Sequence, residues 1–221
     1  LDKAGQKGTG KWTSIDALDR GVLLSSITES VFARCISSEK EKRMKLSKIF
    51  KDNSTSSIPH SLFPIPSIPL DKFITILENG LYAGMLSSYA QGFDLIDIAV
   101  KEEKWTINLA VTARIWEGGC IIRAEILNFL HKAFLKSQTL ECHSPSSCHS
   151  REDGNPVDKS QQVHLFEIPE VKTAMEDSIP NLREICALGI LNGIPMASLT
   201  TALNYFDSIT SEKLPANLIQ G

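Results

Sequence analysis

Residues 5–13 combine three glycines, two lysines and two threonines, residue types that together suit the binding of phosphate or carboxylate groups. Glycine lets the backbone approach a ligand closely and adopt positive φ angles at little steric cost. The cationic side chains of Lys7 and Lys11, with the amide groups at the start of a helix, favour an anion. Because a helix-like segment follows at residues 13–20, the sequence predicts an anion-binding loop at a helix start.

Two other interpretations of this loop have to be weighed. The P-loop pattern of nucleotide triphosphatases fits from Gly5 to Lys11, but Trp12 stands where that pattern requires the magnesium-binding serine or threonine. No apolar strand precedes the loop, so the pattern disfavours a triphosphatase. A solvated glycine turn that caps the helix at residues 13–20 is the plainer alternative.

Apolar residues recur with helical spacing almost throughout the chain, and no segment alternates like a strand. The sequence therefore predicts an all-α fold. The expected helices cover residues 14–20, 27–38, 39–51, 70–100, 108–116, 120–136, 169–179, 181–191 and 197–211. Pro180 is expected to separate or kink two of them, and the Gly-Ile-Pro run at 193–195 to stop the second.

Two polar stretches interrupt the pattern. Residues 52–69 are rich in serine, threonine and proline and predict a loop, and residues 138–166 lack any period and predict a flexible insertion. Between them, Gly80 and Gly84 lie four residues apart on the longest helix, which allows another helix to pack closely there. With these two interruptions, residues 1–221 are predicted to form a single all-helical domain.

Composition excludes several classes of protein. A formal net charge of −3 argues against a general nucleic-acid or membrane-surface role, and no apolar run approaches the roughly 20 residues of a membrane span. A cytoplasmic protein is expected. Cys35, Cys120 and Cys186 lie in apolar, helix-like surroundings and are interpreted as small core residues.

A cluster of potential metal ligands lies in the predicted insertion. Cys142, His143, Cys148 and His149 fall within eight residues, but their spacing matches no common zinc finger and the segment is polar. No metal site is predicted.

Five blocks, taken together, carry a resemblance to a known family. AGQKGTGKWT (residues 4–13), ESVFARCISS (29–38), SYAQGFDLI (88–96), ARIWEGGCIIRAEIL (113–127) and LPANLIQ (214–220) occur in the order found in the C-terminal part of decarboxylating 6-phosphogluconate dehydrogenase. The chain resembles this family over nearly its whole length, with gaps at about 51–70 and 138–166. The resemblance implies the helical C-terminal domain of that enzyme, without its Rossmann domain.

The resemblance assigns substrate-binding roles to three residues. In the family, the lysine and threonine of the KGTG loop and the arginine of VFAR hold the sugar-acid phosphate and neighbouring groups, and Lys7, Thr9 and Arg34 occupy these positions. Arginine offers a two-pronged donor for phosphate, lysine a point charge and threonine a hydroxyl. Surface ion pairing for Lys7 and Arg34, and helix capping for Thr9, remain the alternatives.

Other prominent side chains are interpreted as structural. Trp12 is assigned to packing rather than substrate contact, and His131 to a structural or surface role. Tyr89 and Gln91 are expected to pack along the long helix, and the glycine pair at 118–119 to form a helix junction and subunit contact.

The resemblance also implies what the chain would need from elsewhere. The family enzyme oxidises 6-phosphogluconate with NADP and releases carbon dioxide to give ribulose 5-phosphate in the pentose phosphate pathway. Its nucleotide domain and its acid/base lysine and glutamate precede the loop, so no catalytic residue is expected in this chain and the cofactor-binding residues are unknown. A homodimer and a separate chain that carries the Rossmann domain are the expected partners. The alternative hypothesis is a catalytically dead remnant that dimerises as an interaction module.

Overall fold

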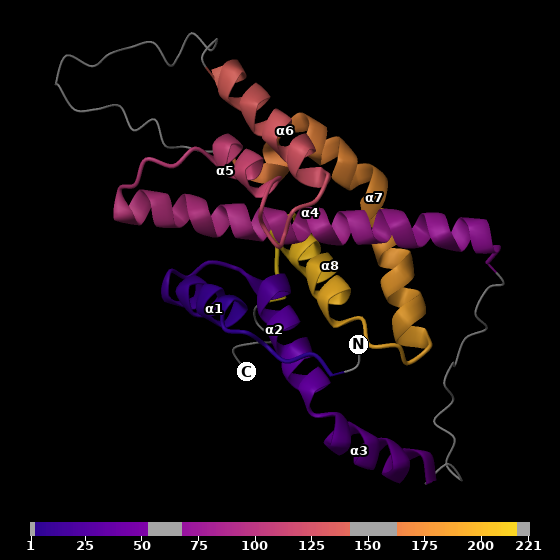
Figure 1. The fold of residues 1–221 in the computed structure, drawn as a ribbon. Coiled ribbons are helices and arrows are strands. Elements are labelled where there is room, and N and C mark those ends of the chain that lie inside the picture. Colours follow the sequence, from indigo (N-terminus) through magenta and orange to yellow (C-terminus); the bar gives the residue numbers. More distant parts are fainter. Residues whose placement is uncertain (1–2, 53–67, 142–162, 216–221) are drawn as a thin grey trace, which may run out of the picture. The chain divides into compact units, whose positions relative to one another are not determined.

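The computed structural model describes residues 3–52, 68–141 and 163–215, and within these ranges it contains helices and turns but no strand (Figure 1). This confirms the predicted all-α fold. The elements are α1 (Thr9–Asp19), α2 (Ser25–Ser38), α3 (Lys40–Asp52), α4 (Leu70–Glu103), α5 (Leu109–Trp116), α6 (Ile126–Glu141), the 3-10 turn η2 (Leu165–Glu167), α7 (Pro169–Leu191) and α8 (Ala197–Ile209). Among the described residues, no helix is long and apolar enough to cross a membrane.

The chain divides into two compact units. The first comprises Leu1–Gln91 with Asp177–Gly221, and the second is Gly92–Glu176, so α4 and α7 each contribute residues to both. The single domain expected over residues 1–221 stays a prediction. The predicted loop at 52–69 and the predicted insertion at 138–166 fall largely outside the described residues. The boundary at residue 138 is wrong, since residues 138–141 still belong to α6.

Close helix packing in the first unit depends on glycines of α4. A Cβ atom added at Gly80 would lie 2.9 Å from Cγ2 of Ile185 and 3.2 Å from the carbonyl oxygen of Asn181, both on α7. One added at Gly84 would lie 2.7 Å from a methyl group of Leu199 on α8. The predicted close approach at these glycines is confirmed. Gly80 packs against α7, and Gly84 packs against α8.

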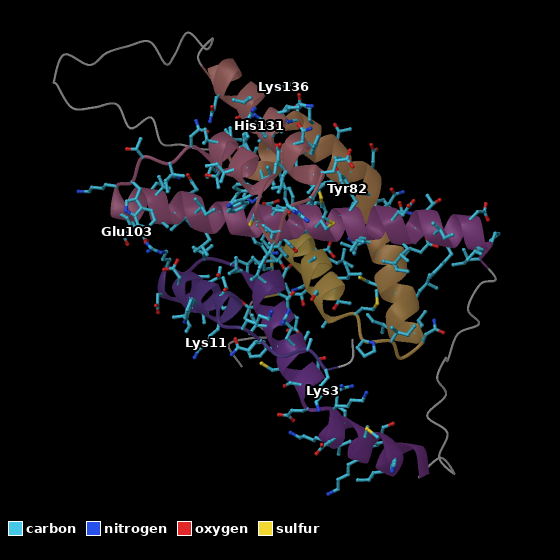
Figure 2. All side chains as sticks on the ribbon, in the orientation of Figure 1. Lys3, Lys11, Tyr82, Glu103, His131 and Lys136 are labelled. Atoms are coloured by element: carbon cyan, nitrogen blue, oxygen red, sulfur yellow. The ribbon has the colours of Figure 1, made fainter. Side chains whose placement is uncertain are left out.

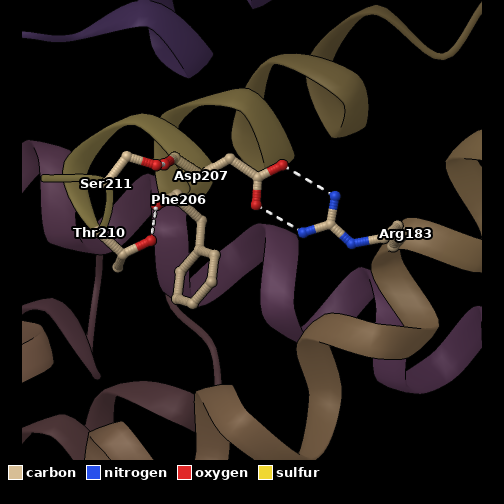
Figure 3. Close-up of polar contacts among 5 residues, drawn as sticks. All are labelled: Arg183, Phe206, Asp207, Thr210 and Ser211. Carbon is tan, nitrogen blue, oxygen red and sulfur yellow. Dashed lines mark hydrogen bonds and ion pairs between the residues drawn. The ribbon is translucent and has the colours of Figure 1, made fainter. Parts of the chain in front are cut away.

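An ion pair joins α7 to α8 on the surface of the same unit. The Arg183 guanidinium donates to both carboxylate oxygens of Asp207, with 2.9 Å between Nη1 and Oδ2, in the two-pronged geometry drawn in Figure 3. Because the two side chains are 57% and 40% exposed, the contact is solvated and adds little to stability.

Gln91 is a buried polar bridge rather than a packing residue, which corrects the sequence interpretation. Its carbonyl oxygen accepts a hydrogen bond from the backbone N–H of Ser26 (2.9 Å), and its amide nitrogen donates to the Ser26 hydroxyl (2.7 Å). Leu24, the residue that precedes α2, offers no side-chain cap. Gln91 of α4 therefore satisfies a backbone donor at the start of α2 that the helix itself cannot satisfy.

The second unit has an aromatic centre. The ring of Phe93 lies 5.3 Å from that of Trp116 and 4.9 Å from that of Phe134, centroid to centroid. On α6, Nδ1 of His131 lies 2.8 Å from the carbonyl oxygen of Ala110 on α5. His131, labelled in Figure 2, thus has the structural role predicted for it.

Several helix boundaries differ from the prediction. Residues 120–125 are not helical, so the helix expected from 120 begins at Ile126. Glu39 is not helical either, so the helix expected from 39 begins at Lys40 as α3. Pro180 lies inside one continuous helix, α7, so it does not separate two helices. The stop at 193–195 is confirmed. Gly193 has φ 66°, and the N–H of Ile194 donates to the carbonyl of Gly189 at 2.8 Å.

Candidate functional site: the glycine-rich loop and Arg34

The glycine-rich loop is shorter than predicted because α1 begins at Thr9. Gly8 occupies the cap position with φ 104°, a conformation that favours glycine, and its N–H donates to the side-chain oxygen of Gln6 at 3.0 Å. Lys11 and Trp12 consequently lie within the first turn of α1, and the Lys11 side chain is exposed (Figure 2). The helix predicted to follow the loop at residues 13–20 therefore begins inside the glycine-rich segment, at Thr9.

Arg34 reaches this loop from α2. Its Nε donates to the carbonyl oxygen of Gly5 at 2.9 Å, and Nη2 donates to the same oxygen. Three residues further along α2, the Ser37 hydroxyl accepts a hydrogen bond from the N–H of Ala4 at 3.0 Å. Two neighbouring residues of the loop are therefore attached to one face of α2, because positions three apart on a helix lie side by side.

The three predicted substrate-binding residues share this corner of the first unit, with Lys7 on the loop, Thr9 at the first position of α1 and Arg34 on α2 against the loop. All three side chains are exposed. Within the described ranges, neither Lys7 nor Arg34 takes part in an ion pair, so the structure gives no support to surface ion pairing as their role. Their charges are available to an anionic ligand.

The two remaining alternatives for the loop can also be judged. Gly8, not Thr9, is the cap residue of α1, and no side chain caps this helix, so helix capping does not explain Thr9. For the P-loop, the hydroxyl of Thr13 donates to the carbonyl of Thr9 inside α1 at 2.9 Å, and the described residues before the loop form no strand. Trp12 therefore remains at the magnesium position of the pattern, and the nearest hydroxyl, that of Thr13, is engaged inside α1, so the described residues give no support to a P-loop.

Trp12 does not pack into the fold as predicted, since 69% of it is exposed. The cysteine interpretation is right for Cys186, which is buried and whose thiol has a raised pKa because burial disfavours the charged form. It is wrong for Cys35, which is exposed, while Cys120 is half-buried.

The residues examined for metal binding, Cys142, His143, Cys148 and His149, lie outside the described residues. Within the described ranges, no group of three or more histidine, cysteine, aspartate and glutamate side chains is arranged to hold a metal ion.

Sequence reasoning missed Gln6 and Ser37, two side chains that hold the loop backbone together with Arg34. Neither carries a charge or belongs to a general binding pattern. The Gln6 contact spans two residues of the chain, whereas Ser37 lies 33 residues from Ala4, so the role of Ser37 depends on how α2 lies against the loop. At Gly10, where an added Cβ would lie 2.7 Å from Cγ2 of Val31, the two helices approach closely.

The whole chain matches a known family model. The model described as 6-phosphogluconate dehydrogenase, C-terminal domain, matches residues 1–221. Curated relatives named 6-phosphogluconate dehydrogenase, decarboxylating, are 38% identical over 221 residues in Cunninghamella elegans, 38% over 220 in Dictyostelium discoideum and 39% over 222 in Staphylococcus epidermidis. These alignments cover 99–100% of this chain but 39–40% of each relative.

A solved structure supports the same likeness. Plasmodium falciparum 6-phosphogluconate dehydrogenase, described in its apo form, with its cofactor NADP+ and with its substrate 6-phosphogluconate, superposes with a TM-score of 0.79 at 32% identity. The match covers 100% of this chain and 41% of that chain.

Proposed function

Because the chain belongs to the 6-phosphogluconate dehydrogenase C-terminal domain family, we propose that its glycine-rich loop and Arg34 form part of a binding site for 6-phosphogluconate. The observation that carries the proposal is the meeting of Lys7, Thr9 and Arg34, from two separate family blocks, at one exposed corner of the first unit. Arg34 is held there by the Gly5 carbonyl. Two cationic side chains, a hydroxyl and first-turn amides of α1 suit a phosphate and its neighbouring hydroxyl groups.

The reaction proposed for the complete enzyme is the NADP-dependent oxidation of 6-phosphogluconate, followed by loss of carbon dioxide to give ribulose 5-phosphate in the pentose phosphate pathway. NADP supplies the hydride acceptor. The described residues of this chain contribute binding and orientation, and no residue of the chain is assigned acid/base work. Catalysis therefore requires a nucleotide-binding domain, in the same polypeptide or in a separate chain. The cytoplasm is the proposed location.

Self-association is the second component of the proposal. Large apolar side chains are exposed on the first three helices, including Trp12, Leu18, Phe32, Ile36 and Phe50, of which 57–76% is accessible. Exposed apolar surface of this kind is typical of association interfaces, which supports a homodimer. The same observation supports the alternative that the chain is a catalytically dead module whose only activity is dimerisation.

Calorimetric titration of the chain with 6-phosphogluconate tests the proposal. Lys7→Ala is the sharpest variant, because Arg34→Ala would also release Gly5 and so disturb the loop. Loss of one charge-assisted contact at an exposed site is expected to weaken binding by about 2- to 5-fold. Lys48→Ala, which removes an exposed charge from α3, is the matched control and should bind like the unmodified chain.

The outcomes separate the candidate functions. Binding that is weakened by Lys7→Ala but not by Lys48→Ala supports the substrate site. A folded chain that binds no 6-phosphogluconate but sediments as a dimer favours the interaction module. Magnesium-dependent binding of ATP would contradict both and would revive the P-loop interpretation.

A further inference from the structure

We propose that Ser37 is a positioning residue of the substrate site, which holds the glycine-rich loop against α2 so that Lys7 and Thr9 face the ligand. This inference rests on the proposed function, and it assigns Ser37 no contact with substrate. Its hydroxyl accepts the hydrogen bond from the N–H of Ala4 at 3.0 Å, at the point where the chain enters the loop.

The contact matters because fixing the loop in one conformation costs conformational entropy. Residues 5–10 include three glycines, which lose more backbone freedom on becoming fixed than any other residue type. A loop that is held in place before the ligand arrives does not have to be ordered at the expense of binding free energy. Ser37 holds Ala4 and Arg34 holds Gly5, so α2 attaches the entrance of the loop at two consecutive residues.

The backbone of Ser37 is itself held by a residue of α3. Arg43 of α3 donates from Nε to the carbonyl oxygen of Ile36 at 3.0 Å and from Nη2 to that of Ser37 at 3.1 Å. These carbonyls belong to the last turn of α2, where a helix leaves acceptors without partners. The Ser37 backbone is therefore anchored while its side chain binds the loop.

The adjacent serine provides a matched control. Ser38 donates its hydroxyl to the carbonyl of Cys35 at 2.6 Å, a contact within α2, and the side chain is exposed. Ser37→Ala and Ser38→Ala each remove a hydroxyl group, one residue apart on the same helix. Only Ser37→Ala removes the hydroxyl that accepts the hydrogen bond from the Ala4 N–H. Ser37→Thr retains the hydroxyl and should restore the contact.

The experiment uses the full chain and two measurements. The first is hydrogen exchange of the Ala4 amide, followed by NMR of chain labelled with ¹⁵N-alanine. The second is calorimetric titration with 6-phosphogluconate. In Ser37→Ala, the Ala4 amide is expected to exchange about 3- to 10-fold faster and the affinity to fall by a similar factor, the effect of losing one hydrogen bond. Ser38→Ala and Ser37→Thr should match the unmodified chain in both measurements.

Thermal unfolding separates positioning from general destabilisation, since alanine is a better helix former than serine and should not weaken α2. A weaker affinity at an unchanged unfolding temperature supports the proposal. Equal exchange of Ala4 in the unmodified chain and Ser37→Ala overturns it, and so does faster exchange with unchanged affinity. If the unmodified chain binds no 6-phosphogluconate, the proposed function fails and the positioning role fails with it, while the exchange rates still decide whether the Ala4 contact exists.

Discussion

Replacing Gln91 by methionine should destabilise the first unit by about 2–4 kcal/mol, although the two side chains have similar lengths and helix propensities. Gln91 is fully buried, and Ser26, its partner at the start of α2, is 2% exposed. Methionine fills the same space but can neither accept from the Ser26 N–H nor donate to the Ser26 hydroxyl. Water has little access to replace those contacts.

The magnitude follows from the two buried groups that lose their partners; the Ser25 hydroxyl, 3.4 Å from the Gln91 oxygen, is only half-buried. The Ser26 N–H, 2.9 Å from the Gln91 oxygen, and the Ser26 hydroxyl, 2.7 Å from the Gln91 nitrogen, would both stay buried. Each buried polar group left unsatisfied costs about 1–3 kcal/mol, and the apolar methionine side chain recovers part of the total because its burial is favourable. The remaining loss is a large fraction of the stability of an ordinary domain.

Urea unfolding followed by circular dichroism measures this loss, with Ser88→Ala as the control. The Ser88 hydroxyl donates to the carbonyl of Gly84 within α4, so its removal should change the free energy of unfolding by less than about 0.5 kcal/mol. Adding Ser26→Ala to Gln91→Met removes one of the two orphaned groups, so the double variant should lose less stability than the two single variants summed. A free energy of unfolding for Gln91→Met within about 0.5 kcal/mol of the unmodified chain would refute the bridge as a stabilising element.

Two further predictions concern packing and pH. Gly80→Ala should lower the free energy of unfolding by about 1–3 kcal/mol despite the better helix propensity of alanine, because the new methyl group meets backbone atoms of α7; an unchanged urea midpoint would contradict this. The pKa of Asp94 is raised, chiefly by burial and further by Asp97, while His164 and Lys101 oppose the rise. A raised carboxyl pKa in the folded state means that stability is lost as pH rises through it, so Asp94→Asn should raise the unfolding temperature at pH 7. That gain should vanish below about pH 3, where both states carry the protonated carboxyl; an unchanged or lower unfolding temperature at pH 7 would refute the assignment.

Local pattern was sufficient to predict most helices of this chain. The long run of α4 was recognised because its apolar residues keep a helical period over many turns, and Gly80 and Gly84 were correctly interpreted as sites of close packing. The start of α5 was also predicted within one residue, and the structure shows Asn108 capping the helix by accepting from the N–H of Val111. Each of these signals is contained in a few neighbouring residues.

Predictions failed where a distant contact or a compensating environment decides the outcome. Of the two outcomes predicted for Pro180, separation of two helices is wrong: the proline removes one hydrogen bond from α7, but the helix continues through it. Gln91 looked like a packing residue because its partner, Ser26, is 65 residues away in the sequence. Trp12 is predicted to pack rather than to contact substrate, yet α1 buries Ser14 and Ala17 and leaves the indole exposed.

The candidate site illustrates the same division between residue identity and placement. Lys7, Thr9 and Arg34 were identifiable from the family blocks, but nothing local to those blocks says what brings Arg34 to the loop. That placement depends on the position of α2. In its first turn, the N–H of Ser26 donates to Gln91, and in its last turn, the carbonyl of Ile36 accepts from Arg43.

A helix held at both ends has little freedom to shift or fray, and this one carries both groups that bind the loop entrance. Disturbing either end of α2 should therefore act on ligand affinity through the loop, even though Gln91 and Arg43 are assigned no contact with the ligand. Variants at Gln91 should lose affinity together with stability, whereas Ser37→Ala should lose affinity alone, and this difference separates the support of the scaffold from the positioning of the site.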